Sequence, residues 1–248
     1  MLVLAAVLLA APAQAPDPAA AAKPVVQKAI DAAGGAELLG KLKAGTGKIK
    51  GQLANLGSDI DFTGDMAYEV PGKYKLTLSA DIAGSKMVVE QAVNGAKLKH
   101  TVNGSPQEID DRVKAEMGMA LRLMEVMQLV PLLDAARYTL AAEKDADVDG
   151  KPTAVVLVKG KDFKDTRLFF AKDTGLLLRT ERKGLAPGTS PKDFKEVTET
   201  TTFADYRKTD GVLLPYKAVV THDGKKFMSF GYTEAKLMEK IDPKLIGD

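Results

Sequence analysis

Apolar and polar side chains alternate along much of this chain, and a period of two is the pattern of half-buried β-strands. Residues 60–70 show it most clearly. One face of this segment carries Ile60, Phe62, Gly64, Met66, Tyr68 and Val70. The other face is mainly acidic and small, so we predict a strand with one side against a core and the other in water.

Several strands of the same kind follow, separated by short turns. The next strand has one apolar face made of Tyr74, Leu76, Leu78 and Ala80. The turns between strands are supplied by Pro71-Gly72, Asn94-Gly95 and Asn103-Gly104. Glycine and asparagine tolerate the backbone angles that tight turns need, so this succession predicts an up-and-down antiparallel meander.

Residues 200–232 are predicted to form three more strands, joined at Asp210-Gly211 and Asp223-Gly224. On one parity the middle strand carries Val212, Leu214, Tyr216, Ala218 and Val220, and the last strand carries Met228, Phe230 and Tyr232. Pro215 lies on the opposite parity of the middle strand and has no N–H to donate. We therefore expect Pro215 near a sheet edge, or at a position outside the strand pairing.

Helical periodicity is confined to two regions. In residues 24–43 apolar side chains recur at helical spacing and Gly34-Gly35 interrupts them, which predicts a pair of helices. A further helix is predicted to begin at Ser105 and to run to about Val130. Ser105 can cap it, and Glu108 can complete a capping box three residues later.

The second half of this central helix is apolar almost all round, from Met117 onward, and it contains four methionines. A helix that is apolar on every side is normally buried. Two interpretations stay open. The helix packs on the sheet as part of the core, or it lines an apolar cavity that a ligand can share, for which adaptable methionine side chains are suited.

Together these segments predict an α+β protein that is mainly antiparallel β. We count about ten or eleven strands, nearly all joined by short turns, with helices grouped at the start and in the middle. Helices do not alternate with strands, which argues against a parallel βαβ sheet. Residues 16–248 are predicted to form a single domain, in which 16–23 are a flexible lead-in.

Composition excludes several classes of function. Lys and Arg number 35 against 33 Asp and Glu, with the signs interleaved and only 6% aromatic residues, so we expect no nucleic-acid partner. The chain has no cysteine, which removes disulfides, thiolate metal sites and thiol catalysis.

The first residues resemble a secretion signal. An apolar run at 2–11 is too short to span a bilayer and is followed by Ala13-Gln14-Ala15, a small-residue cleavage site, although no Lys or Arg precedes the run. We expect residues 1–15 to be a signal peptide and the mature chain to be periplasmic or secreted. No later stretch is long and apolar enough for a membrane span.

The motifs that usually carry chemistry fail on inspection. Asp145, Asp147 and Asp149 begin like a calcium-binding loop, but Val156 stands where that loop needs a glutamate, so an acidic turn is the simpler interpretation. Residues 45–48 resemble a phosphate loop only faintly, since the first glycine and the final Ser or Thr are missing.

The two histidines form no metal-binding pair. His100 shares the parity of an apolar strand face and is predicted to point inward, whereas His222 adjoins a turn and is predicted to be solvated. We predict no metal, no cofactor and no catalytic residue.

The order and spacing of the motifs resemble the outer-membrane lipoprotein-sorting superfamily, the LolA/LolB-like lipoprotein-localisation carriers. The resemblance covers most of the mature chain. It is carried by residues 32–42, 68–74, 94–95, 148–152, 168–179, 203–215 and 221–226. It implies a strongly curved, unclosed β-barrel whose N-terminal and central helices cover its mouth, around an apolar cavity that holds acyl chains. We match no residue here to the carriers' cavity arginine.

The first functional hypothesis is therefore a non-enzymatic periplasmic carrier or binding protein for lipid or an acylated lipoprotein, expected to be a monomer. From the central helix the candidate ligand-binding residues are Met117, Leu121, Met124 and Met127. From the sheet they are Phe62, Met66, Tyr68, Tyr74 and Leu76. Core packing is the alternative role for each of them.

Two other hypotheses stay open. The chain could be an envelope interaction module with a packed core and no ligand, which would bind a protein partner through Pro215 and the loop 185–193. A cavity of several hundred Å³ would favour the carrier over this module. An enzyme would need His100 to meet an acidic or hydroxyl partner inside the cavity.

Overall fold

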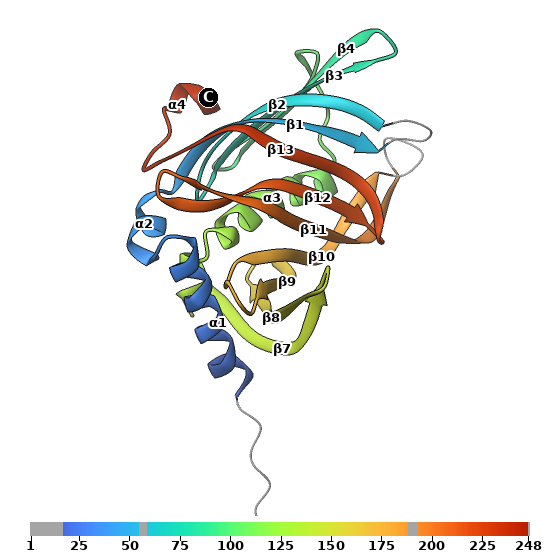
Figure 1. Ribbon diagram of the computed structural model, residues 1–248. Helices are drawn as coiled ribbons and strands as arrows, with labels where there is room; N and C mark the ends of the chain where they lie inside the picture. Colours follow the sequence, from blue (N-terminus) through green and yellow to red (C-terminus); the bar gives the residue numbers. More distant parts are fainter. Residues whose placement is uncertain (1–16, 55–58, 188–192, 248) are drawn as a thin grey trace, which may run out of the picture.

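One antiparallel sheet forms the body of the protein. The structure is a computed structural model that describes residues 17–54, 59–187 and 193–247 (Figure 1). The first meander consists of β1 (Ala44–Ala54), β2 (Asp59–Glu69), β3 (Lys73–Ile82), β4 (Ser85–Asn94), β5 (Lys97–Val102) and β6 (Ser105–Pro106). The second consists of β7 (Tyr138–Val148), β8 (Lys151–Gly160), β9 (Phe163–Ala171), β10 (Leu177–Pro187), β11 (Phe194–Thr209), β12 (Val212–His222) and β13 (Lys225–Met238).

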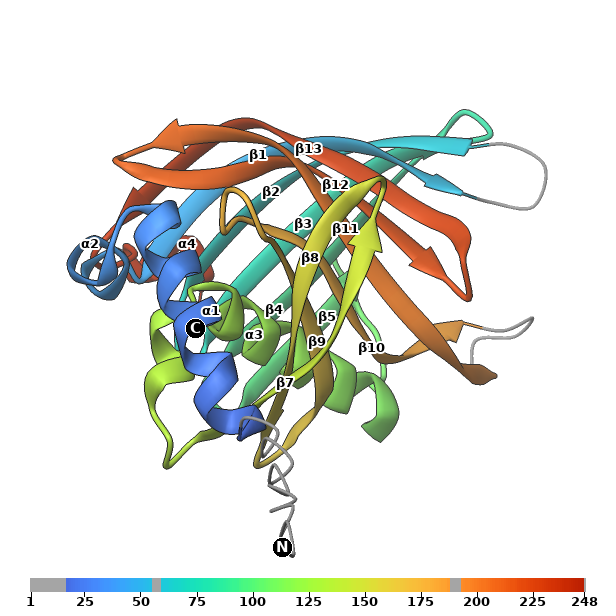
Figure 2. The same ribbon diagram turned by 60° about the horizontal axis from the view of Figure 1, so that its bottom comes forward.

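The two meanders are joined through their outer strands, β1 and β13, which pair antiparallel. The strand order is β6-β5-β4-β3-β2-β1-β13-β12-β11-β10-β9-β8-β7, so β6 and β7 are the edges and the sheet is not closed. Figure 2 shows how strongly this sheet curves. The predicted mainly antiparallel, unclosed sheet is confirmed.

The predicted count of about ten or eleven strands is wrong, because the described residues form 13. One reason lies at Ser105 and Pro106, which we expected to start a helix. They pair instead with Val102 and Thr101 as the short strand β6. The helix α3 (Asp111–Met127) begins later, where the Asp110 carboxylate accepts a hydrogen bond from the Arg112 N–H at 2.8 Å.

The N-terminal helices also differ from the expectation. Helix α1 (Pro18–Ala33) begins where the Asp17 carboxylate accepts from the Ala19 N–H at 3.0 Å, so residues 18–23 are helical and not a flexible lead-in. An alanine-rich segment has high helix propensity, and α1 buries Ala22, Val26, Ala29 and Ile30. Helix α2 (Ala36–Lys41) follows after Gly34 and Gly35. The expected signal peptide, residues 1–15, lies outside the described residues.

The predicted hairpins at the end of the chain are confirmed. Asp210 and Gly211, like Asp223 and Gly224, have positive φ, which the tight turns between β11, β12 and β13 require. Pro215 pairs with Tyr206 on one side, whereas the pairing of β12 with β13 begins only at Lys217. Pro215 is therefore not in an edge strand, but its missing N–H falls outside the β12–β13 pairing.

The main core lies between the concave side of the sheet and the helices α1 and η1 (Val130–Leu133). Val26 and Ile30 of α1 pack with fully buried residues of β8 and β9, among them Val156, Leu168 and Phe170. A smaller cluster covers the other face of the same strands, made of Val148, Val155, Phe169, Ala171 and Leu178. Helix α3 lies inside the curve of the sheet (Figures 1 and 2), and the short helix α4 (Pro243–Ile246) packs outside it on β2, β3 and β4. Within the described ranges, no helix is both long and apolar enough to cross a membrane.

Candidate functional site

A cavity of about 470 Å³ lies between α3 and the concave face of the sheet. Its wall is mostly apolar and comes from β1, β2, β3 and β10–β13, with the ends of α1 and α2 at one side. From α3 the lining residues are Ala120, Leu123, Met124 and Met127, and Gln128 at its C-terminal end lines the cavity too. These recur at intervals of three and four residues, so one stripe of the helix faces the cavity. The volume is in the range of small-molecule sites.

Strand β1 makes the floor of this cavity without filling it. Its concave side carries Gly45, Gly47 and Gly51, and a Cβ at any of them would come within 2.8 Å of an aromatic ring or closer. The rings belong to Tyr68 and Phe62 of β2 and to Tyr232 of β13, which therefore lie flat across β1. The absence of a side chain at these three positions permits the close approach, and Ile49 is the β1 residue on this face that lines the cavity.

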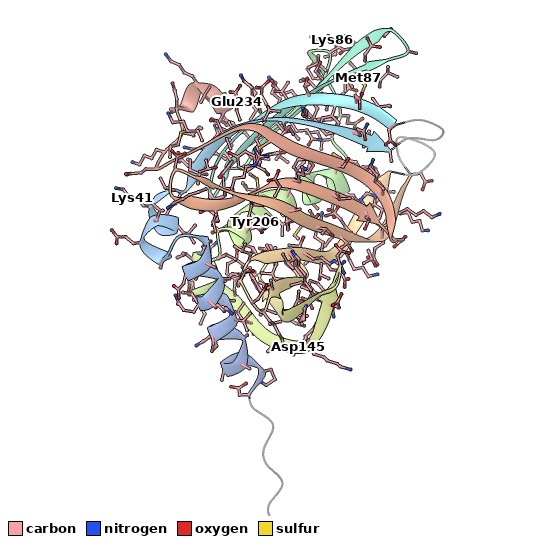
Figure 3. The ribbon with its side chains drawn as sticks, in the orientation of Figure 1. Lys41, Lys86, Met87, Asp145, Tyr206 and Glu234 are labelled. Carbon is pink, nitrogen blue, oxygen red and sulfur yellow. The ribbon has the colours of Figure 1, made fainter. Side chains whose placement is uncertain are left out.

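Aromatic side chains dominate the wall. Five of the six tyrosines of the chain line the cavity, and four phenylalanines do so too: Tyr68, Tyr74, Tyr206, Tyr216, Tyr232, Phe62, Phe203, Phe227 and Phe230. Tyr206, labelled in Figure 3, lies near the middle of the molecule. Such rings bring a large apolar surface, and the tyrosines add a polar tip to it.

Three of these tyrosine hydroxyls are engaged within the protein. Tyr206 donates to the Leu177 carbonyl, Tyr232 donates to Met66 Sδ at 3.1 Å, and the Tyr216 and Thr209 hydroxyls lie 2.9 Å apart. Burial raises the pKa of the Tyr232 hydroxyl to about 12, and it raises the pKa of the Tyr68, Tyr74 and Tyr206 hydroxyls further still. All four remain neutral over the physiological range.

A network of charged side chains lies at the part of the wall formed by β10 and β11. Arg182 of β10 donates to Glu116 of α3 at 2.8 Å and to Glu199 of β11 at 2.9 Å. Glu116 also accepts from Lys164 of β9, which ties α3 to the sheet at two points. Each carboxylate has a cation beside it, so this network is close to neutral.

His222, predicted to be solvated, is instead largely covered. Its side chain is only 12% exposed, its Nε2 lies 3.5 Å from Glu199, and its ring stacks on Phe227 at 4.1 Å. His100 points to the concave side as expected, but it does not line the cavity, and its buried Nδ1 has no partner among the described residues. The acidic or hydroxyl partner that an enzyme would need at His100 is not present in the described ranges.

Seven of the nine predicted ligand-binding residues line the cavity. They are Phe62, Met66, Tyr68, Tyr74, Leu76, Met124 and Met127. Met117 and Leu121 are not part of the described lining: Met117 precedes the stripe of α3 that faces the cavity, and Leu121 lies beside that stripe. Met117 is buried and Leu121 is partly buried.

The lining residues that the prediction missed come mainly from β10–β13, and the others come from β1, β3 and the three helices α1, α2 and α3. The signal for the β10–β13 group was present, because residues 212–220 and 228–232 have one apolar parity each, and those parities line the cavity. For β1 the sequence signal is its series of glycines, Gly45, Gly47 and Gly51, whereas from the sequence we interpret residues 45–48 only as a faint phosphate loop. The acidic segment near Asp147 forms a turn, where the Asp147 carboxylate accepts from the Gly150 N–H at 2.6 Å.

A second hollow, of about 480 Å³, lies on the opposite face of the sheet beside α4. Its lining mixes charged side chains with apolar ones such as Met66 and Leu245, and Glu234, labelled in Figure 3, pairs there with Lys48 at 2.9 Å. Lys75, also in this lining, pairs with Glu90 at 3.3 Å. Because these charges satisfy one another at an open surface, the apolar cavity is the better candidate for a ligand site.

No protein-family model matches the sequence, and no curated protein matches it. Solved structures do. A LolA superfamily protein from Nitrosomonas europaea superposes with a TM-score of 0.57 at 9% identity, over 90% of this chain and 97% of the other. An outer membrane lipoprotein-sorting protein domain from Vibrio parahaemolyticus gives 0.56 at 12% identity, over 92% and 97%. The chain has the LolA-superfamily fold.

A further structure with this LolA-like fold is a DUF1329 family protein from Desulfovibrio piger, with a TM-score of 0.54 at 14% identity, over 94% of this chain and 98% of the other. In all three cases nearly the whole of both chains is matched. At these identities the likeness establishes the fold, and the function has to be argued from the cavity itself.

Proposed function

We propose that this protein is a non-enzymatic carrier or binding protein for a lipid or an acylated lipoprotein, in the periplasm or outside the cell. The observation that carries the proposal is the cavity of about 470 Å³ with a mostly apolar wall under α3. Apolar cavities of this size favour a carrier over a module with a packed core. The LolA-like fold supports the same function by analogy, and so does the signal peptide expected at residues 1–15.

The physical basis for loading is the transfer of an acyl chain from water to the apolar wall. Each buried methylene contributes about 0.8 kcal/mol, which is roughly a fourfold change in affinity. Leu76, Met124 and Phe230 present flexible and flat apolar groups that can contact a chain over its length. The charges of Arg182, Glu116 and Glu199 pair with one another, and Lys217, the remaining charged residue of the lining, is exposed to solvent.

The test is a binding titration with a series of acyl ligands of increasing length, together with mass spectrometry of lipid extracted from the purified protein. We expect extractable lipid, and an affinity that rises roughly fourfold per methylene until the cavity is full. Clean extracts together with no saturable uptake of any chain length would contradict the carrier and favour the interaction module.

A pair of variants on α3 locates the site. Ala120 lines the cavity, so Ala120→Phe places a ring in the space that the chain would occupy. Ala115→Phe makes the same change at an exposed position of the same helix and is the matched control. We expect Ala120→Phe to reduce binding at least tenfold and Ala115→Phe to leave it unchanged. Equal effects of the two variants would place binding elsewhere.

A further inference from the structure

Two tyrosine hydroxyls in the cavity wall have no hydrogen-bond partner among the described residues. They belong to Tyr68 of β2 and Tyr74 of β3, which pair directly across the two strands. Two side-chain polar atoms of the described residues are buried without a partner, His100 Nδ1 and Arg179 Nε, and the tyrosine hydroxyls are not among them. These hydroxyls are therefore not sealed inside the protein but are accessible from the cavity.

The Tyr68 side chain owes its placement to Gly45 of β1, and Tyr74 lies beside it as its partner in the pairing of β2 with β3. A Cβ at Gly45 would lie 2.8 Å from the Tyr68 hydroxyl oxygen, so the ring reaches across β1 only because Gly45 has no side chain. Tyr232 lies across Gly47, two residues further along the same face, and its hydroxyl reaches Met66. Three phenol groups thus converge at one end of the cavity.

The neighbouring aromatic residues show that the two hydroxyls are not needed for packing. Phe62 and Phe230 present the same ring in the same wall without a hydroxyl, and the hydroxyls of Tyr206 and Tyr216 have partners in the protein. A hydroxyl without a partner in apolar surroundings costs free energy, because it has lost the hydrogen bonds that it made with water in the unfolded chain. Tyr68 and Tyr74 therefore present two spare donors in an otherwise apolar wall.

The protonation state of the Tyr68 and Tyr74 hydroxyls decides which ligand groups can bind to them. Burial and the neighbouring Tyr232 hold the pKa of both hydroxyls well above the ordinary range, so both keep their proton and donate. No cation contributes to these two pKa shifts. Arg182 lies far from this end of the cavity. Strand pairing leads from Arg182 through Glu199 and His222 to Lys225 of β13, and Lys225 precedes Tyr232 by seven residues, which is about 20 Å along the strand.

We propose that Tyr68 and Tyr74 donate hydrogen bonds to the ester or amide carbonyl at the head of an acyl chain. The cavity then takes esterified or amidated acyl groups in preference to free fatty-acid anions. A carboxylate at this position would be desolvated with no cation beside it, whereas a neutral carbonyl only exchanges water for phenol donors. This inference rests on the proposed carrier function and narrows its ligand to acyl esters and amides.

The first experiment compares methyl laurate with pentadecane, which has the same number of heavy atoms and no acceptor. The Y68F/Y74F double variant is expected to bind methyl laurate roughly tenfold more weakly and pentadecane unchanged. Tyr216→Phe is the control, because that hydroxyl lines the cavity but bonds to Thr209. It should leave the ratio of the two affinities unchanged. A ratio that is the same in the double variant as in the wild type overturns the inference.

The wild-type protein provides a second test that needs no substitution. The infrared carbonyl band of ¹³C-labelled methyl laurate should move to the hydrogen-bonded position on binding, and free laurate at pH 8 should bind more weakly than its ester. A carbonyl band at the free position, or laurate that binds as tightly as the ester, would refute the role of the two hydroxyls. If neither methyl laurate nor pentadecane binds saturably, the carrier function itself fails. If both bind and the tyrosines make no difference, only this inference fails.

Discussion

Two parts of this sheet use the same antiparallel meander for opposite purposes: a filled half at β7–β9 and a hollow half at β1–β3 and β10–β13. In β8 and β9 the side chains of Val156, Val158, Leu168 and Phe170 are at most 1% exposed, because α1 and η1 fill the concave side above them. In β3 no residue from Lys73 to Ala80 is fully buried. The comparison shows that this fold can pack one half densely and keep the other half hollow.

The difference comes from what lies opposite each half. Helix α1 presents small and branched residues at close range to β7 and β8, and their side chains interlock. Helix α3 instead stands off β1–β3, where Gly45, Gly47 and Gly51 remove side chains from the floor. The hollow half therefore keeps its apolar surface without filling the space, which is the property a carrier of acyl chains needs.

The largest expected effect separates the two halves by stability. Phe170→Ala in the filled half should lower the free energy of unfolding by about 3–5 kcal/mol, since it leaves a closed void. Leu76→Ala in the hollow half should cost only about 1 kcal/mol, because one side of Leu76 already faces a cavity. Urea denaturation measures both. Equal losses would mean that the hollow half is packed in solution.

Alanine at two different glycine positions should change the free energy of unfolding by smaller amounts and in opposite directions. Gly47→Ala puts a Cβ 2.5 Å from the Tyr232 ring, so the ring must shift and the free energy of unfolding should fall by about 1–2 kcal/mol. Gly118→Ala, inside α3 with open space around it, should raise that free energy by about 0.5–1 kcal/mol. Thermal denaturation of the two variants gives the signs. A neutral Gly47→Ala would show that the ring does not need the bare strand.

The last expected effect is a dependence on alkaline pH, which contributes nothing at neutral pH. The pKa of the Tyr232 hydroxyl is raised to about 12 in the folded protein, against about 10 in the unfolded chain. The unfolded chain therefore loses this proton first, and stability that is complete below pH 10 falls between about pH 10 and 12. In absorbance titration most tyrosines should ionise above pH 10 in the folded protein. Six tyrosines that all titrate near 10 would mean that the hollow half is open to water.

The sequence predicts much of this fold because each strand carries its own signal. The alternation at residues 60–70 and the Asp-Gly turns at 210–211 and 223–224 depend only on neighbours in the chain, and the structure follows them. The role of Ser105 could not be predicted in this way. Its local sequence favours a helix cap, but in the structure it pairs with β5, and this pairing depends on a neighbouring strand.

The cavity could be predicted only in part. An apolar strand face that packs on a helix and one that faces a cavity have the same pattern, so Leu76 could not be distinguished from a core residue. The glycines of β1 carry the missing information, but their meaning depends on rings that arrive from β2 and β13. Met117 and Leu121 could not be excluded either, because the point at which α3 leaves the cavity depends on tertiary packing.

The most direct test of the account is NMR of the methionine methyl groups during addition of an acyl ester. Four methionines line the cavity, Met66, Met124, Met127 and Met228, whereas Met87, Met117, Met119 and Met238 do not belong to its described lining. Met87, labelled in Figure 3, lies on the β3–β4 hairpin far from α3. We expect the first four signals to shift together and to show contacts with the acyl chain, while the second four stay in place. Shifts confined to Met87 and Met238, or no shift at all, would contradict it.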